Sequence, residues 1–144
     1  MFSGEFEHSV DDKGRLIIPI SQRPQISEGA FITRGFESCL FIFPLETWQD
    51  IADQLNQWPT TRAEARFVSR LLFSGNETTL DKQGRISISP PLREHAGIEL
   101  GGEVVVVGVN NRIELWNKDR WKDFTAMMEQ EATKFADELG DFTF

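Results

Sequence analysis

The chain has 144 residues, with 15 Lys or Arg against 23 Asp or Glu, so its formal net charge is −8. No apolar run approaches the roughly 20 residues of a membrane span, and the polar, acidic residues 1–5 exclude a secretory signal peptide. The single cysteine, Cys39, excludes an intrachain disulfide and lies in an apolar run, so we expect a soluble intracellular protein with a buried thiol.

The negative charge at first argues against a nucleic-acid partner, but it is unevenly distributed. From residue 123 to the end, six acids face one base, Lys134, and this segment carries −5 of the total. In the rest of the chain, acidic and basic side chains are nearly equal in number. Because overall charge governs solubility more than it governs a local binding face, a DNA-binding surface remains open.

The first hairpin is expected near the start of the chain. Polar and apolar residues broadly alternate over 5–10, as in a half-buried strand. A turn follows, in which Asp11 can accept hydrogen bonds from turn amides and Gly14 supplies a positive φ. Strand character resumes over 15–18 and ends at Pro19, which cannot donate to a ladder.

A second hairpin is expected after a short irregular or helical link at residues 21–27. Its strands are two runs with high β propensity, at 31–33 and 39–43, on either side of a turn at 35–38. The first half of the chain therefore predicts two hairpins joined by a short connection.

Two helices are expected next. Apolar residues recur at helical spacing over 45–55, and residues 61–64, Thr-Arg-Ala-Glu, fit a capping box that opens a second helix. The second helix carries a stripe of Arg62, Arg66 and Arg70 with an acid close by. We interpret this stripe as a solvated face and leave open whether it contacts DNA.

The second half repeats the order of the first. Residues 80–88 echo residues 10–18 at an offset of 70, and the tripeptide Phe-Ser-Gly precedes both copies. A duplication with so long a period indicates two copies of one small domain rather than a solenoid. Asn110 and Asn111 stand at the second hairpin turn of this copy, where a positive-φ pair is favoured.

A long helix is expected to close the chain. Asn117 is its predicted N-cap, and an apolar stripe with helical spacing follows. The stripe packs either on the chain's own sheet or in a groove between subunits. Its members are Trp121, Phe124, Met128, Ala132, Phe135 and Leu139.

These elements predict an α+β fold, mostly β, made of tandem duplicated double hairpins with helices after each half. Halves of about 45 residues rarely bury enough apolar area alone, so they should share a core with each other or with other subunits. The expected divisions are a first repeat at 5–47, a helical connector at 48–76, a second repeat at 77–120, and a C-terminal amphipathic helix with an acidic tail at 121–144.

The most closely repeated feature is an exposed turn, Asp-x-x-x-Arg, at 11–15 and 81–85. The arginine could simply pair with its aspartate, and an exposed pair of that kind adds little stability. However, the spacing survives in two halves that differ at most other positions. A planar guanidinium on a rigid turn suits a guanine edge or a phosphate, so we interpret Arg15 and Arg85 as DNA-binding.

Catalytic and metal-binding chemistry is poorly supported. His8 and His95 occupy unrelated places in the two halves, and neither belongs to a metal-ligand spacing. Asp11 and Asp81 could be paired catalytic carboxylates, but an aspartate that opens a glycine turn is more often structural. We expect no enzyme, no cofactor, no metal and no small-molecule substrate.

At these residues the chain resembles the MraZ family, bacterial regulators encoded at the head of the division and cell-wall gene cluster. The likeness covers nearly the whole chain, and its motifs together are specific where a lone Asp-x-x-x-Arg would be weak. The matching segments are residues 1–5, 11–15, 18–19, 81–85, 91–97 and 113–116.

The resemblance implies two AbrB-type swapped-hairpin halves, a ring-shaped homo-oligomer, and a cytoplasmic, nucleoid-associated transcription regulator. It also implies binding to short G-rich direct repeats in double-stranded DNA upstream of its own operon. The expected DNA-binding residues are Asp11, Lys13, Gly14, Arg15, Asp81, Lys82, Gly84 and Arg85. The alternatives are a non-DNA assembly or adaptor protein that uses the aromatic stripes and, more remotely, an enzyme built on the turn aspartates and a histidine.

Overall fold

The computed structural model describes residues 1–143, so Phe144, at the end of the predicted acidic tail, lies outside the described residues. Both halves run through two strands, a short helix, two more strands and a longer helix. The first half consists of β1 (Glu5–Ser9), β2 (Arg15–Ile17), the 3-10 helix Ile20–Ile26, β3 (Ala30–Arg34), β4 (Leu40–Pro44) and α1 (Leu45–Asn56), followed by α2 (Ala63–Leu72). The second half consists of β5 (Asn76–Thr78), β6 (Arg85–Ser87), α3 (Pro90–Ala96), β7 (Glu103–Val109), β8 (Arg112–Asn117) and α4 (Lys118–Leu139).

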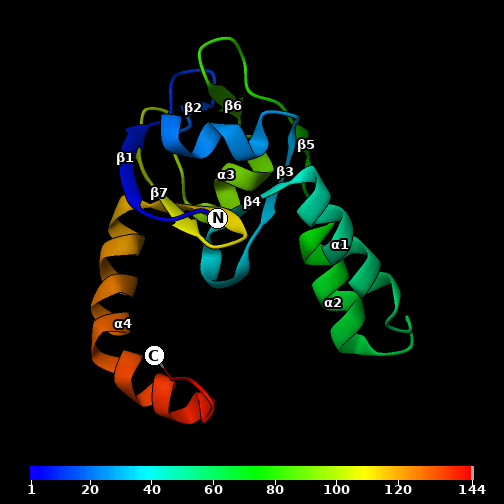
Figure 1. Cartoon of the computed structure of the whole chain (residues 1–144). Helices are drawn as coiled ribbons and strands as arrows, with labels where there is room; N and C mark the ends of the chain where they lie inside the picture. Colours follow the sequence, from blue (N-terminus) through cyan, green and yellow to red (C-terminus); the bar gives the residue numbers. More distant parts are fainter. Residues whose placement is uncertain (144) are drawn as a thin grey trace.

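The elements form a central sheet with a small ribbon at one end and two helical arms at the other (Figure 1). The ribbon consists of β2 and β6, and the arms are the α1–α2 pair and α4. The predicted α+β class with duplicated halves is confirmed. Within residues 1–143, no helix combines the length and the apolar character that crossing a membrane requires.

Strands are exchanged between the two halves of the sheet. Six strands form one antiparallel sheet in the order β1-β7-β8-β4-β3-β5. The second hairpin of each half is a local pair, as predicted, because β3 pairs with β4 and β7 with β8. The first strand of each half instead joins the other half, with Phe6 of β1 opposite Val106 of β7 and Glu77 of β5 opposite Phe31 of β3.

The first hairpin expected from the residues of each half is wrong as a local strand pair. β2 pairs with β6 in antiparallel register, so that Leu16 lies opposite Ile86. A turn sequence specifies a bend in the backbone, whereas the partner of each flanking strand depends on apolar contacts far away in the sequence. The exchange is the arrangement that the family resemblance implied. The division of the chain at residues 47, 76 and 120 stays a prediction.

Apolar side chains fill both faces of the sheet, which explains why its inner strands read as continuous apolar runs. Along β4, Leu40 and Ile42 join one buried cluster, while Phe41 and Phe43 join the other. The ribbon, α3 and the 3-10 helix close the first cluster. The second cluster is closed by α1, α2 and the first turns of α4.

The helix boundaries confirm two expectations and correct a third. α1 covers the predicted stretch, and the side chain of Asn117 caps α4 by accepting a hydrogen bond from the Arg120 amide at 3.0 Å. The predicted capping box of α2 is wrong, because Arg62 is the N-cap residue and its side chain makes no capping bond. The carboxylate of Glu64 instead accepts a hydrogen bond from Nη2 of Arg62 at 2.8 Å.

Burial of the ribbon yields a stability prediction. Leu16 is fully buried beneath the ribbon, whereas its neighbour Ile17 is 42% exposed on the outer side. Leu16→Ala should lower the free energy of unfolding by about 2–5 kcal/mol, because it leaves a cavity in the core. Ile17→Ala should lower it by less than about 1 kcal/mol. Chemical denaturation followed by circular dichroism compares the two variants, and equal losses would show that the ribbon does not close the core.

Candidate nucleic-acid interface

The two Asp-x-x-x-Arg turns lie together at the ribbon end of the molecule. They precede β2 and β6, whose antiparallel pairing places Arg15 opposite Ser87 and Arg85 opposite Ile17. Leu16 and Ile86 alternate with these residues and are buried on the inner face. The outer face of the ribbon therefore carries both turn arginines.

The first turn is fixed by a single carboxylate. Oδ1 of Asp11 accepts hydrogen bonds from the amides of Lys13 at 2.9 Å and Arg15 at 2.8 Å. The Asp11 backbone closes the turn, since its N–H donates to the Arg15 carbonyl at 2.9 Å and its carbonyl accepts from the Gly14 amide at 3.1 Å. Gly14 has a φ of +79°, a left-handed conformation that few side chains tolerate.

The second turn reproduces this geometry bond for bond. Oδ1 of Asp81 accepts hydrogen bonds from the amides of Gln83 and Arg85, both at 2.9 Å. The Asp81 carbonyl accepts from the amide of Gly84, whose φ is +77°. Two segments of different sequence thus fold into the same rigid turn, which explains the survival of the motif in both halves.

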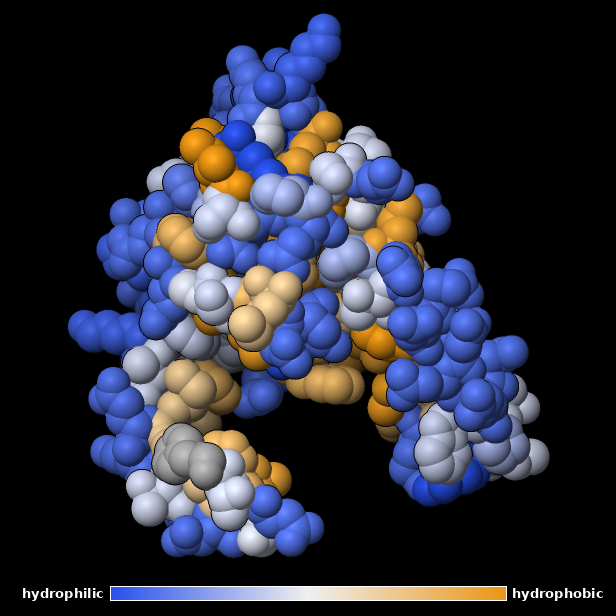
Figure 2. All heavy atoms as spheres, viewed as in Figure 1, coloured by the Kyte–Doolittle hydropathy of each residue, from blue (hydrophilic) through white to orange (hydrophobic). Residues whose placement is uncertain are grey.

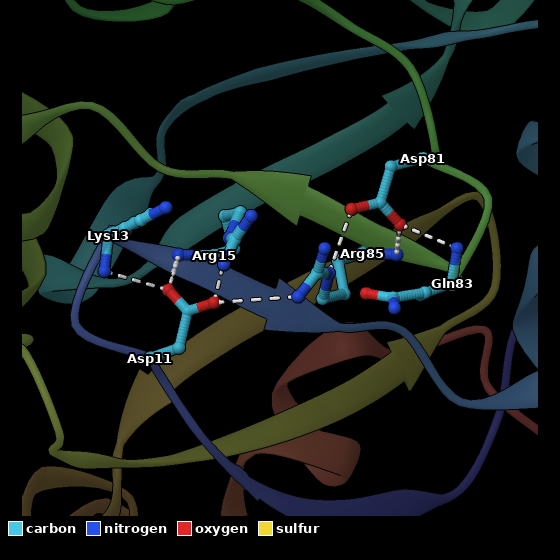
Figure 3. Close-up of polar contacts among 6 residues, drawn as sticks. All are labelled: Asp11, Lys13, Arg15, Asp81, Gln83 and Arg85. Carbon is cyan, nitrogen blue, oxygen red and sulfur yellow. Dashed lines mark hydrogen bonds and ion pairs between the residues drawn. The ribbon is translucent and has the colours of Figure 1, made fainter.

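The second oxygen of each aspartate holds the arginine side chain. Nε of Arg15 donates to Oδ2 of Asp11 at 2.7 Å, and Nε of Arg85 donates to Oδ2 of Asp81 at 2.8 Å. Asp11 also lies 3.8 Å from Nη1 of Arg85, so it faces both arginines in Figure 3. Because Nε engages the aspartate in each case, the Nη groups remain as the donors that an external acceptor would meet.

The aspartates are strongly held in their charged form. Hydrogen bonding to the Arg15 amide is the largest cause that lowers the pKa of Asp11, from 3.8 to about 2. The Arg15 side chain and the Lys13 amide lower the pKa of Asp11 further. Bonds from Arg85 and Gln83 lower the pKa of Asp81 in the same way. Each turn therefore keeps an ion pair that orients the guanidinium at any physiological pH.

The two lysines predicted at the turns occupy different positions. Lys13 is equivalent to Gln83, whereas Lys82 is equivalent to Asp12, although both lysine side chains are exposed. The outer strand residues also differ, since exposed Ile17 lies beside Arg85 and exposed Ser87 lies beside Arg15. The turns share a backbone but present different side chains around their arginines.

Each turn is also attached to the other half of the chain. The Ile88 amide donates to the Gly14 carbonyl at 2.8 Å, and the Ile18 amide donates to the Gly84 carbonyl at 2.9 Å. Arg93 and Arg23 lie against these two glycines. Sequence reasoning gave neither arginine a role at the turns, although their spacing of 70 residues matches the offset of the turns themselves.

The remaining candidate groups lie elsewhere in the fold. His8 lies on β1, whereas His95 lies on α3 with its Nε2 3.1 Å from the Gly35 carbonyl oxygen. Cys39 is buried, as predicted, and burial raises the pKa of its thiol. Among residues 1–143, no cluster of His, Cys, Asp and Glu side chains suits a metal ion.

The arginine stripe of α2 is only partly solvated. Nη1 of Arg66 donates to the Thr60 carbonyl at 3.0 Å, and the guanidinium of Arg62 lies 5.0 Å from the centre of the Trp58 ring. α2 belongs to an arm at the opposite end of the molecule from the ribbon (Figure 1). The structure therefore does not bring this stripe together with the turn arginines.

Comparison with known proteins places the whole chain among one group of relatives. A family model described as "MraZ protein, putative antitoxin-like" matches twice, at residues 1–71 and 72–142. A Roseiflexus protein (strain RS-1) is 44% identical over all of both chains. Relatives from Lactobacillus delbrueckii subsp. bulgaricus and Natranaerobius thermophilus are 45% and 39% identical, over 98% and 99% of each chain respectively. All three relatives carry the name "Transcriptional regulator MraZ".

The hydrogen bonds of the first turn predict an unusual titration. Asp11 should titrate near pH 2 in the folded chain and near its ordinary value of 3.8 after unfolding. Since its folded pKa is the lower one, its contribution to stability is fully present above about pH 4 and is lost as the pH falls towards 2.

Carboxyl-carbon NMR of the folded and urea-unfolded chain measures both midpoints. A folded midpoint near 3.8 would contradict the turn geometry, and Arg15→Ala should raise the midpoint only partly because the backbone bonds remain.

Proposed function

The chain belongs to the MraZ family, and on that premise we propose that it is a DNA-binding transcriptional regulator whose turn arginines read base edges. The observation that supports this most directly is the duplicated turn, which presents two oriented guanidinium groups on one exposed ribbon face. The names of the curated relatives support the regulatory role. They also agree with the expectation that the chain is not an enzyme.

The ribbon has a suitable shape for duplex DNA. A two-stranded antiparallel ribbon fits the major groove, which is about 12 Å wide. An arginine whose Nε is already engaged keeps two Nη donors, and these can bond O6 and N7 of one guanine. We propose that Arg15 and Arg85 make these contacts and that Asp11 and Asp81 orient them. Gly14 and Gly84 permit the tight turns.

Local charge supports the same partner in spite of the acidic chain. The turns and the two arginines against them carry six cationic side chains, Lys13, Arg15, Arg23, Lys82, Arg85 and Arg93. Three aspartates, Asp11, Asp12 and Asp81, oppose them. Lys13 and Lys82 are exposed and free to follow phosphates, which attracts DNA without reading its sequence.

The expected targets follow from the family resemblance and from the chemistry of arginine. Guanine is the base that arginine binds best, which supports short G-rich sites. We propose direct repeats upstream of the chain's own operon, in the division and cell-wall gene cluster, as the operator. The protein would then work in the cytoplasm, on the nucleoid.

We also propose a ring-shaped homo-oligomer, supported by the two helical arms. The first turns of α4 pack on the chain's own sheet, where Trp116 lies 5.3 Å from Trp121 and 4.8 Å from Phe124 between ring centres. Further along α4, Phe135 is 54% exposed and Leu139 is 69% exposed. Among residues 1–143, the apolar stripe thus packs on the chain's own sheet at its start, whereas Phe135 and Leu139 in its distal part are exposed.

The other arm offers a complementary surface. Residues of α1, α2 and the segments that follow each of them line a hollow of about 500 Å³, whose walls include Leu55, Trp58 and Phe73. The charged side chains among the lining residues are Arg66 and Arg70, both cationic. This hollow is called the arm groove below.

A second copy of the chain suits the arm groove better than another partner. The distal part of α4 combines apolar side chains with four acids, Glu129, Glu131, Asp137 and Glu138, against one base, Lys134. Both arms start from the same face of the sheet, but they stand apart at the left and right of Figures 1 and 2, so α4 does not fill the groove of its own chain. Contact between two different surfaces is heterologous, and heterologous contacts close into rings when the rotation permits.

The DNA-binding proposal predicts the behaviour of the turn arginines. Arg15→Ala or Arg85→Ala should each reduce operator preference by about 5- to 150-fold, the range of about 1–3 kcal/mol that one bidentate base contact supplies. Arg→Lys should restore attraction to phosphate but recover little base preference, because lysine lacks the planar fork. Asp11→Asn should have a smaller effect.

The measurement is a gel-shift titration on operator and scrambled DNA at two salt concentrations, with circular dichroism as the folding control. Binding of the wild-type chain should weaken steeply with salt, because phosphate contacts release counterions. If both alanine variants fold and bind operator like the wild type, the turns are structural. The alternative function, a non-DNA assembly or adaptor protein, is then favoured.

The ring proposal predicts complementary assembly defects. A helix variant, Phe135→Asp with Leu139→Asp, and a groove variant, Arg66→Glu with Arg70→Glu, should each sediment as smaller species than the wild type. Their 1:1 mixture should form a heterodimer, because one intact groove meets one intact helix and no further copy can join. Gln130→Asp, on the opposite face of α4, should leave assembly unchanged.

Sedimentation velocity without DNA distinguishes the outcomes. Wild-type mass for either double variant, or a mixture that stays monomeric, would contradict docking of α4 in the arm groove of a second copy. Loss of assembly in the Gln130→Asp control would show that added negative charge alone disrupts the oligomer.

A further inference from the structure

Arg93 and Arg23 lie against the turns at positions that repeat between the halves. Nη1 of Arg93, on α3, donates to the Ile88 carbonyl at 2.6 Å, and the guanidinium covers the Cα of Gly14. Nε of Arg23, on the 3-10 helix, donates to the Ile18 carbonyl at 2.7 Å, and its guanidinium covers Gly84. Both side chains are half-buried.

We propose that Arg93 and Arg23 are positioning residues for the turns, each bracing the turn that belongs to the opposite half. Arg93 of the second half would set the place of Arg15, and Arg23 of the first half would set the place of Arg85. The effect on DNA rests on the function proposed above. The effect on the turns themselves does not depend on it.

Each brace is part of a closed set of contacts. Ile88 accepts the Arg93 bond at its carbonyl and donates its amide to the Gly14 carbonyl at 2.8 Å. Ile18 joins Arg23 to Gly84 in the same way, with an amide bond of 2.9 Å. A guanidinium, a strand end and a turn glycine therefore support one another on both sides of the ribbon.

The space beside the two turn glycines supports the brace independently of the hydrogen bonds. A positive φ alone would also admit Asn, which tolerates the left-handed conformation. At Gly14, however, a Cβ would fit only if Nη1 of Arg93 moved away from its present position. A Cβ at Gly84 would lie 2.5 Å from Nε and 2.6 Å from Nη1 of Arg23. The plane of the bracing arginine occupies the side-chain space of each turn glycine.

The brace matters because arginine readout is geometric. A bidentate contact to guanine requires both Nη donors to meet fixed acceptors, so small displacements of the turn weaken discrimination. The aspartates fix each arginine relative to its own turn. The bracing arginines fix each turn relative to the other half, and hence fix the two reading arginines relative to each other.

Hydrogen–deuterium exchange of the full chain tests the brace without DNA. Arg93→Ala should accelerate amide exchange about 2- to 10-fold in residues 10–17, the effect expected for one lost hydrogen bond, and leave residues 80–87 unchanged. Arg23→Ala should do the reverse. Lys122→Ala, exposed on α4, should change neither segment.

Equal acceleration in both turns, or none, would overturn the proposal, because a general loss of stability does not select one turn. Arg93→Lys provides a second test in case the alanine variant does not fold. It keeps the charge but lacks the planar group over Gly14, so it should accelerate exchange in residues 10–17 alone. Unchanged exchange in that variant would also overturn the brace.

Salt-dependent binding separates positioning from direct contact. Arg93→Ala should reduce the preference for operator over scrambled DNA by about 3- to 10-fold, with an unchanged slope of log K against log salt, because no phosphate contact is lost. If the magnitude of the slope of log K against log salt instead falls by about 0.9 while the preference for operator DNA is unchanged, Arg93 contacts a phosphate and the proposal is overturned. If the wild-type chain shows no operator preference, the proposed function fails while the exchange result still decides the brace.

Discussion

The exchange of strands between the halves is the constraint on which the rest of the molecule depends. Because β1 pairs with β7 and β5 with β3, each turn leads from the large sheet into the ribbon formed by both halves. The pairing of β2 with β6 brings two segments 70 residues apart onto one exposed face. Burial of Leu16 and Ile86 then forces the arginines outward.

Much of the fold could be predicted from local signals, and the failures share one cause. Continuous apolar runs located the second hairpins, and helical spacing located α1. Of the pair expected to have positive φ at the turn of the second copy, Asn110 has one and Asn111 does not, whereas Glu37 and Ser38 both do. The local sequence could not indicate that β1 and β5 pair with strands of the other half, because that pairing depends on apolar contacts across the shared core. At the site, the spacing of Asp11 and Arg15 predicted their pairing. The contact of Arg93 with Gly14 joins residues of different halves, so no local pattern could reveal it.

The acidic composition and the proposed DNA partner are compatible because the charges are separated in space. Acids gather on the distal part of α4, at the end of an arm, whereas the turn arginines lie at the ribbon end (Figure 1). Asp11 and Asp81 are each paired with the arginine of their own turn, which reduces the repulsion that these two carboxylates would exert on a phosphate. Local arrangement thus outweighs total charge, as expected for a surface screened over about 8–10 Å.

Fusion of the two halves in one chain has a consequence for orientation. A symmetric dimer of identical halves would present two identical turns and would suit a palindrome. Here Ile17 lies beside Arg85 while Ser87 lies beside Arg15, and Oδ2 of Asp11 lies 3.8 Å from Nη1 of Arg85, the arginine of the other turn. The ribbon therefore has a polarity, so a bound chain would point one way along the duplex. Identical chains in a head-to-tail ring would then all point the same way along the duplex. Such an arrangement suits direct repeats, which also share one orientation, rather than inverted repeats.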